Sequence, residues 1–409
     1  MLCDPKFTDF GSEQFGKSKH RAILTVGIEQ LFTPPKLSMA NSPSIPQSVS
    51  FFSGGGGLDL GLECAGFDTR FANDIDLQSC LTLQAARDNP VAGKHPFLHN
   101  AHVHHGDIRD VSGDFVLKSA KLKKGDVSLL CGGPPCQAFS IFGKRMGRKD
   151  QRGQLVYEYF RLLGELQPES FVFENVFGLL TVENGEVFRQ ACKHLAEPKK
   201  NLKYEISVMR LNAEDYGVPQ HRDRVFIIGS LRGIKVQPPT PICGSPGTQD
   251  VLPYRTVKDG LRNLGKPNPD WPSNHTGRKH SERIISRYDG MGPGERDHFT
   301  RINKLDLTKP SYTIIVGSDK GGGKGHIHPI SPREVTPRES ARMQTFPDWW
   351  TFKGNGRHAI RQIGNAVPPL LAFAVGNAVR TQLFGLKEKP LSHAIKLLGQ
   401  EHLFPKITK

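Results

Sequence analysis

Cys136 stands in a setting that no other cysteine of this chain shares. An apolar segment at residues 127–131 is followed directly by Gly132, Gly133, Pro134 and Pro135, and Cys136 comes next. Two prolines fix the backbone, so the thiol is expected at the end of a strand, where open α/β sheets bind their ligands. A thiol held there could act as a nucleophile. A buried structural role, the usual alternative, suits the other six cysteines better.

Glu174 also follows an apolar segment, at residues 170–173. Parallel strands would bring Cys136 and Glu174 to one edge, as a nucleophile and a proton donor within reach of one substrate. The alternative for Glu174 is a helix cap. Arg222 and Arg224 alternate in an extended segment, so their side chains are expected to point the same way. They could clamp a base or a phosphate, or simply form a solvated edge.

A glycine run, Gly54 to Gly57, separates an apolar segment from a helical one. Glycine lets the backbone approach a ligand closely, and the amide groups of the helix start would face that ligand. Asp74 follows 20 residues after Gly54, at the end of the next strand, where dinucleotide-type folds hold a ribose. The run does not fit the strict pattern of nicotinamide cofactors. The sequence therefore predicts a nucleoside-bearing cofactor; the alternative is a turn with a capping acid.

The elements that must position these residues alternate along the chain. Strands are expected at residues 49–52, 69–73, 127–131, 170–173, 206–211 and 225–228. Helices are expected at 58–65, closed by Gly66, at 155–166, from a capping box at Thr336 to Glu339, and at 369–379 as the last one. This alternation predicts an α/β fold with a mostly parallel, doubly wound, Rossmann-like sheet.

After residue 231, hydrophobic residues no longer recur at the spacing of strands or helices. Residues 232–335 are rich in glycine and proline and carry 17 lysine and arginine residues against 10 acids. We interpret them as a second, smaller, loop-rich domain. Residues 46–231 and 336–390 then form the catalytic domain, residues 1–45 an N-terminal extension of unknown role, and residues 391–409 a C-terminal tail.

The composition limits the class of protein. The chain has 409 residues, 37% hydrophobic residues and a net charge of +15. No apolar run is long enough to cross a bilayer, and no secretory signal is present. Seven cysteines without a regular framework favour a reducing compartment. The positive charge fits solubility or a polyanionic partner such as nucleic acid.

Two histidine clusters, at residues 102–105 and 326–328, suggest a metal at first sight. Neither has cysteine or carboxylate partners at ligand spacing. We therefore expect no metal.

Together these segments resemble the DNA (cytosine-5) methyltransferase family over most of residues 49–380. The similar segments are 52–57, 73–76, 106–108, 133–140, 152–155, 174–176, 220–224, 338–342 and 362–367. Segment 133–140 is the most specific of them. The resemblance implies S-adenosylmethionine as cofactor and S-adenosylhomocysteine as product. It also implies that residues 232–335 are the target recognition domain.

The resemblance also assigns roles to single residues. In the family's scheme, Asp74 holds the ribose hydroxyls, Ile75 packs on adenine and Asp107 contacts the adenine amino group. The remaining cofactor-binding positions are Phe52, Gly54, Gly55, Gly56, Gly57, Ile108, Pro135, Leu155, Asn365 and Val367.

The implied reaction starts with attack of Cys136 on C6 of cytosine, which makes C5 nucleophilic. Glu174 would bind N3 and the exocyclic amine, Arg224 would hold the O2 side, and Arg222 would support it. C6 is shielded in duplex DNA, so the base must be flipped out of the helix.

Expected partners are double-stranded DNA and no membrane, with the chain a cytoplasmic, nucleoid-associated monomer in a bacterial restriction-modification system. A cognate restriction endonuclease is left open as a second partner. Two rival functions remain. An RNA cytosine-5 methylase is one, although the Cys-Phe-Thr signature of the tRNA-acting branch is absent. A DNA-binding protein without chemistry is the other, and a thiol nucleophile argues against it.

Overall fold

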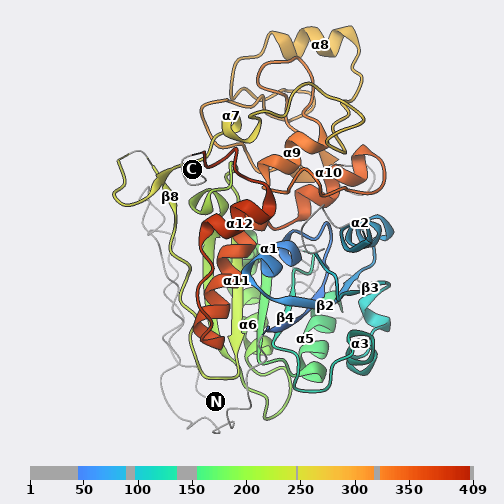
Figure 1. The fold of residues 1–409 in the computed structure, drawn as a ribbon, viewed down its shortest axis with the longest axis vertical. Helices are drawn as coiled ribbons and strands as arrows, with labels where there is room; N and C mark the ends of the chain where they lie inside the picture. The colour runs from blue at the N-terminus through green and yellow to red at the C-terminus, as the bar shows by residue number, and fades with distance from the viewer. Residues whose placement is uncertain (1–44, 89–96, 136–153, 246, 317–322, 406–409) are drawn as a thin grey trace.

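The computed structural model describes residues 45–88, 97–135, 154–245, 247–316 and 323–405 (Figure 1). The lower part of Figure 1 is a sheet flanked by helices, and the upper part is a smaller region with few regular elements. Cys136 lies outside the described residues.

One seven-stranded sheet forms the centre of the larger region. Its strands are β1 (Gln47–Phe51), β2 (Asp68–Asp74), β3 (His102–His105), β4 (Leu129–Gly132), β5 (Ser170–Val176), β6 (Glu205–Asn212) and β7 (Asp223–Ser230). They lie in the order β3-β2-β1-β4-β5-β7-β6. The first five strands run parallel, whereas β7 is antiparallel to both β5 and β6. The chain winds to one side from β1 and to the other from β4, which confirms the predicted doubly wound α/β fold.

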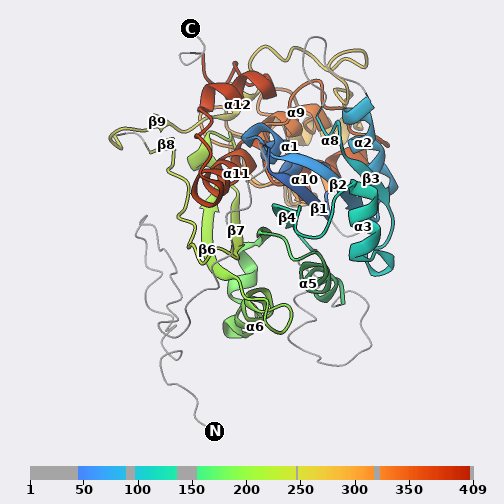
Figure 2. The same cartoon turned by 60° about the horizontal axis from the view of Figure 1, so that its bottom comes forward.

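Helices cover both faces of this sheet, as the turned view in Figure 2 shows. They are α1 (Gly57–Ala65), α2 (Leu77–Asp88), α3 (Gly113–Ala120), α5 (Gln154–Leu166), α6 (Glu186–Ala196), α11 (Pro369–Phe384) and α12 (Leu391–Leu398). Side chains of β5 alternate between two cores: Phe171 and Phe173 join the side of α3, α5 and α6, and Val172 joins the side of α1 and α11. The strands are therefore buried on both faces, as parallel sheets require.

Glycines let α1 and α11 pack closely. A Cβ atom on Gly61 would lie 2.4 Å from the Cβ atom of Ala372, and one on Gly376 would lie 2.9 Å from Leu62. Because α11 covers α1 and α1 follows the glycine run, the C-terminal part of the chain supports the first loop of the sheet.

Two elements end later than the sequence pattern predicts. β5 continues through Glu174 to Val176, because β7 pairs with it in antiparallel fashion as far as Arg224. The expectation that Glu174 follows the strand is therefore wrong; it lies within it. α11 runs on to Phe384, where Gly385 ends it in a left-handed conformation, and α12 follows.

The C-terminal residues 391–405 pack on the fold. Leu403 and Phe404 are buried, and Phe404 lies against Gly217. The predicted capping box is confirmed: Thr336 accepts from the amide of Glu339, and Glu339 accepts from the amide of Thr336.

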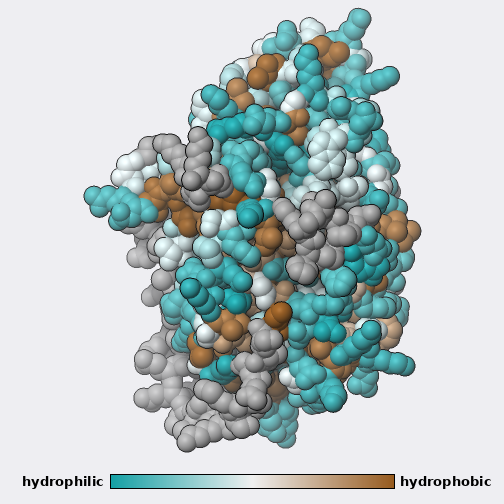
Figure 3. Space-filling view, in the orientation of Figure 1, coloured by the Kyte–Doolittle hydropathy of each residue, from teal (hydrophilic) through white to brown (hydrophobic). Residues whose placement is uncertain are grey.

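The upper region holds short elements joined by long loops. They are β8 (Cys243–Gly244), β9 (Leu252–Pro253), α7 (Val257–Gly260), α8 (Glu282–Asp289), β10 (Ile315–Val316) and β11 (Gly323–Lys324). Hydrophilic side chains predominate on the upper part of the face shown in Figure 3. Between the two regions lie α9 (Pro337–Met343) and α10 (Gly356–Asn365).

Candidate active site

The glycine run forms the turn between β1 and α1. Gly54 and Gly56 have positive φ angles of 54° and 79°, which L-residues with side chains rarely adopt. The amide of Gly54 donates to Oδ2 of Asp74 at 2.7 Å. Phe52 also has a positive φ, of 56°, where the chain leaves β1.

Three of the four glycines are needed by packing within the chain. A Cβ atom on Gly57 would lie 2.1 Å from the carbonyl oxygen of Val367, and one on Gly55 would lie 3.1 Å from that of Gln362. One on Gly56 would lie 2.7 Å from the ring of Trp350. A Cβ atom on Gly54 would have the carbonyl oxygen of Phe52 as its nearest neighbour, at 3.9 Å. Of the four glycines, only Gly54 therefore has no close neighbour in the direction of a side chain.

Asp74 ends β2 and ties two loops together. Its Oδ1 accepts from the amide of Asp76 at 2.8 Å while Oδ2 accepts from Gly54. Burial raises the pKa of this carboxyl, and the two amide donors oppose that rise. An ionised carboxylate offers about four lone-pair sites, so Asp74 keeps acceptor capacity for a further ligand. Ile75 beside it is 65% exposed.

Asp107 follows β3 and begins a short helical turn. It accepts from the amide of Arg109, and the Arg109 guanidinium holds the pKa of Asp107 below its usual value. Ile108 is buried in the core on the side of α5. The side chain of Ile108 is therefore enclosed by the core, whereas the Asp107 carboxylate is near the surface.

The chain leading to Cys136 runs beside Glu174. A Cβ atom on Gly133 would lie 2.5 Å from Oε2 of Glu174. The carbonyl oxygen of Pro134 accepts from the side-chain amide of Asn175 at 2.9 Å, and Pro135 is exposed. The two predicted catalytic segments thus meet at the carboxyl edge of neighbouring strands β4 and β5, as far as the described residues reach.

Glu174 and Arg224 form a buried ion pair. Nε of Arg224 lies 2.8 Å from Oε1 of Glu174, and both residues are less than 9% exposed. Burial raises the pKa of Glu174, while the positive charges of Arg224 and Arg222 lower it. Because burial is the larger effect, this carboxyl takes up a proton more readily than a surface glutamate.

Arg222 faces a different partner from Arg224. Its Nη2 donates to the carbonyl oxygens of Gly364 and Ala366 at 2.6 and 2.9 Å, and the residue is fully buried. Burial, together with Arg224, lowers the pKa of Arg222. Arg222 therefore holds the end of α10 against the catalytic edge, which is where the exposed Asn365 lies.

Leu155 is half-buried against the core on the side of α5. Gln362 begins the segment 362–367 that carries part of the family resemblance, but sequence reasoning missed Trp350 and Arg361, which also contact the two cofactor-type loops from the C-terminal segment. No local pattern could have found them, because the bond from Trp350 to Gly55 spans 295 residues.

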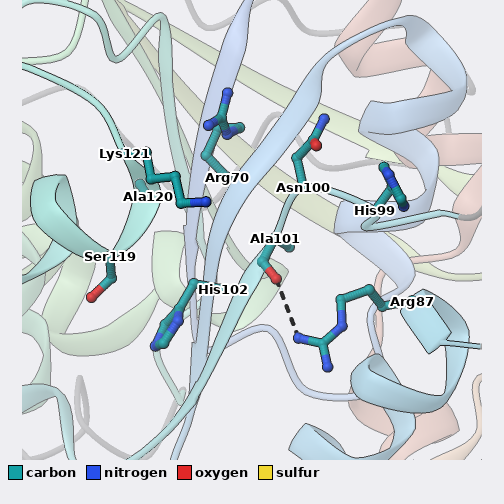
Figure 4. A pocket seen from close by; sticks show the side chains of 9 residues that line it. All are labelled: Arg70, Arg87, His99, Asn100, Ala101, His102, Ser119, Ala120 and Lys121. Carbon is teal, nitrogen blue, oxygen red and sulfur yellow. Dashed lines mark hydrogen bonds between the residues drawn. The ribbon is translucent and has the colours of Figure 1, made fainter.

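A separate hollow of about 380 Å³ lies toward the amino-terminal ends of β2 and β3 (Figure 4). Arg70, Arg87 and Lys121 line it. Arg87 donates to the carbonyl oxygen of Ala101 and pairs with Asp88, and Arg70 donates to Gln47. Both arginines are thus engaged by the fold, and no predicted site residue lines this hollow.

The histidines of residues 102–105 form strand β3. Within the described part of the chain, no group of three or more His, Cys, Asp or Glu residues is arranged to hold a metal ion. No helix in the same residues is both long and apolar enough to cross a membrane.

Comparison with known proteins identifies the family. The family model for C-5 cytosine-specific DNA methylases matches residues 47–381. This chain belongs to that family. Type II methyltransferase M.XorII of Xanthomonas oryzae is 35% identical over 384 residues, covering 84% of this chain and 87% of the relative. M.PspPI of Psychrobacter is 36% identical over 367 residues, covering 83% and 80%.

Solved structures of methyltransferases share the fold. A DNA modification methyltransferase encoded within an E. coli prophage is 26% identical, with a TM-score of 0.65, and covers 83% of this chain and 99% of its own. The Dnmt2 methyltransferase of S. pombe, at 17% identity and a TM-score of 0.57, covers 82% and 98% and supports the fold alone.

As a C-5 cytosine-specific DNA methylase, the protein is a DNA (cytosine-5) methyltransferase, and the family implies S-adenosylmethionine as the methyl donor. The described residues fit such a group. Asp74 retains acceptor capacity, Ile75 offers an exposed apolar side chain, and Gly54, in the turn before α1, has no close neighbour in the direction of a side chain.

Proposed function

We propose that this methyltransferase modifies a cytosine that is flipped out of duplex DNA, through a covalent bond between Cys136 and C6. The observation that carries the proposal is the buried pair of Glu174 and Arg224 beside the backbone of Gly133. A buried acid next to a buried guanidinium can recognise the polar edge of one base, and Cys136 lies three residues further along the chain. Flipping costs a few kcal/mol, which the pocket's contacts offset.

The reaction follows from these groups. The Cys136 thiolate forms a bond to C6, and the electron pair of the C5–C6 double bond makes C5 nucleophilic. Glu174, protonated, donates to N3, and Arg224 stabilises the developing charge on the O2 side. The methyl group added to C5 would come from S-adenosylmethionine when it is bound, with S-adenosylhomocysteine as the product. The C5 proton then passes to solvent, the Cys136 thiolate leaves C6 with the electron pair of the C–S bond, and the proton on N3 returns to Glu174, which restores the aromatic ring.

The cofactor residues are proposed on the same edge of the sheet. Asp74 would accept from the ribose hydroxyls, Ile75 would cover one face of the adenine, and Asp107 would contact its amino group. Ten further positions are proposed to line the cofactor site. They are Phe52, Gly54, Gly55, Gly56, Gly57, Ile108, Pro135, Leu155, Asn365 and Val367.

Replacing Asp74 should weaken cofactor binding. We expect Asp74→Ala to raise the Kd for S-adenosylmethionine by about tenfold or more, because an acceptor for the ribose hydroxyls and the bond to Gly54 are both lost. Isothermal titration calorimetry without DNA measures this directly. Asp110→Ala, at an exposed position nearby, serves as the matched control and should bind as the wild type does. Equal affinity of the Asp74 variant would refute the assignment.

We expect residues 232–335 to select the DNA sequence that is methylated. These residues carry an excess of positive charge. Reading neighbouring pairs requires side chains in a groove of the duplex. Some of the charges would contact phosphate and make binding depend on salt.

A chimera tests this division of labour. We expect that replacing residues 232–335 with the equivalent region of a cytosine methylase of known, different specificity transfers that specificity. Bisulfite sequencing of host DNA identifies the modified site. An active chimera that still methylates the original site would show that the target is chosen elsewhere.

The cellular setting is proposed from the relatives. The relatives are named Type II methyltransferases, and on that basis we propose that this chain is the modification half of a restriction-modification system. We also propose that it acts as a monomer in the bacterial cytoplasm. A cognate restriction endonuclease of the same specificity would then be its genetic partner.

A methylation assay with tritiated cofactor on duplex DNA and on tRNA tests the substrate. Incorporation into duplex DNA alone is the expected result. Incorporation into tRNA would favour the rival RNA methylase, and none into either would overturn the proposal.

A further inference from the structure

The two loops at the proposed cofactor site are held from behind by residues 350–362. Trp350 is 1% exposed, and its Nε1 donates to the carbonyl oxygen of Gly55 at 3.0 Å. Its ring occupies the space that a Cβ atom on Gly56 would need. Trp350 thus contacts two of the four glycines directly.

Arg361 of α10 reaches the second loop. Its Nη2 donates to Oδ1 of Asp76 at 2.6 Å, and the amide of Asp76 donates to Asp74. The side chains of this ion pair are 31% and 28% exposed. The position of the Asp74 carboxylate is therefore linked to α10 through a single intervening residue.

Gln362 joins the same arrangement. Its Oε1 accepts from the hydroxyl of Thr82 at 2.7 Å, and its Nε2 donates to the carbonyl oxygen of Lys353 at 2.9 Å. The bond from Thr82 fixes α10 to α2, which lies next to it in Figure 1, and the bond to Lys353 fixes α10 to the loop before it. Gln362 also packs against Gly55.

We propose that Trp350 and Arg361 are positioning residues for the cofactor, Trp350 by fixing the glycine loop and Arg361 by fixing the turn after Asp74. The inference rests on the proposed function in that these two loops bind S-adenosylmethionine. Neither residue needs to touch the cofactor itself.

The physical reason is the weakness of a loop made of glycines. Four consecutive glycines have no side chains with which to hold one conformation, and glycine loses more entropy on ordering than any other residue. A loop that is ordered before the ligand arrives saves that cost at binding. The hydrogen bond from the Trp350 indole to Gly55 and the ion pair between Arg361 and Asp76 hold the two loops in one conformation. Their loss should therefore weaken cofactor binding without changing the chemistry at Glu174.

Calorimetry with S-adenosylhomocysteine, in the absence of DNA, is the first test. Trp350→Phe keeps an aromatic ring but removes the donor, and we expect the Kd to rise about tenfold. Trp349→Phe is the matched control. Trp349 is the adjacent residue, and its ring lies against those of Phe97 and Trp350, with centroids 5.2 and 5.7 Å away. Its Nε1 makes no hydrogen bond within the described residues, so the substitution keeps a ring and removes only an unused donor. This variant should bind as the wild type does.

Steady-state kinetics separate positioning from general damage. In Trp350→Phe the KM for S-adenosylmethionine should rise about tenfold, while kcat at saturating cofactor and the KM for DNA stay unchanged. A uniform loss in kcat, in both KM values and in thermal stability would mean that Trp350 is merely structural, and would overturn the proposal.

The ion pair provides an independent test at a half-exposed position. Arg361→Met and Asp76→Asn should each raise the Kd, and their effects should be less than additive, because the double variant loses the shared ion pair only once. Asp76 also accepts from the amide and the hydroxyl of Ser79, and an asparagine oxygen can still accept these bonds. Arg361→Lys should restore part of the affinity. Additive effects in this cycle would refute the role of the pair. Failure of the wild type itself to bind S-adenosylhomocysteine would instead overturn the proposed function.

Discussion

Cys136→Ala should abolish methyl transfer, by at least about 10⁴-fold in kcat, while DNA binding is retained. Without the thiolate, C5 of cytosine is too poor a nucleophile, and only binding and orientation remain. DNA affinity depends mainly on phosphate and groove contacts made elsewhere. Tritium incorporation measures the first quantity and a gel-shift titration the second.

A duplex with 5-fluorocytosine at the target should trap the wild type covalently, because fluorine cannot leave as a proton does. The described cysteines are poor competitors: burial raises the pKa of Cys80 and Cys192 to about 12 and that of Cys243 to about 11. A buried thiol with a high pKa is inert. Cys192→Ala, as the control, should keep full activity. An adduct that maps to any cysteine other than Cys136 would contradict the assignment.

Glu174→Gln should lower kcat/KM by about 10²–10⁴-fold, the range expected for loss of a positioned acid. Glutamine keeps the size and the neutral charge of a protonated glutamate but cannot give its proton to N3. It also leaves the buried guanidinium of Arg224 without its carboxylate partner. The kinetics are measured under single-turnover conditions so that product release does not mask the change.

The pH profile gives a second readout for Glu174. Burial raises the pKa of this group, and the proposed reaction needs its protonated form. Activity of the wild type should therefore fall as the pH rises through that pKa, and this alkaline limb should be lost in Glu174→Gln. Glu169→Gln removes a more exposed ion pair with Arg232 and should leave rate and profile unchanged. An unaltered alkaline limb in Glu174→Gln would show that another group titrates.

The sequence alone determined the fold class and the family. Strand and helix patterns depend on neighbouring residues, so the apolar segments 127–131 and 170–173, the cap at Gly66 and the capping box at Thr336 could be predicted without a structure. The catalytic and cofactor segments are short and contiguous, which made the resemblance readable. Where the pattern failed, a distant strand was responsible: pairing with β7 extends β5 past Glu174.

Only the tertiary structure decided what each residue of these segments contacts. The glycine run looked like an approach for a ligand, yet Gly55, Gly56 and Gly57 make room for residues 350–367. Arg222 and Arg224 looked alike, yet one binds the end of α10 and the other binds Glu174. These contacts join positions far apart in the chain, and their geometry depends on how the helices pack on the sheet. Local residue patterns carry no information about such distances, so the supporting residues became visible only in the folded protein.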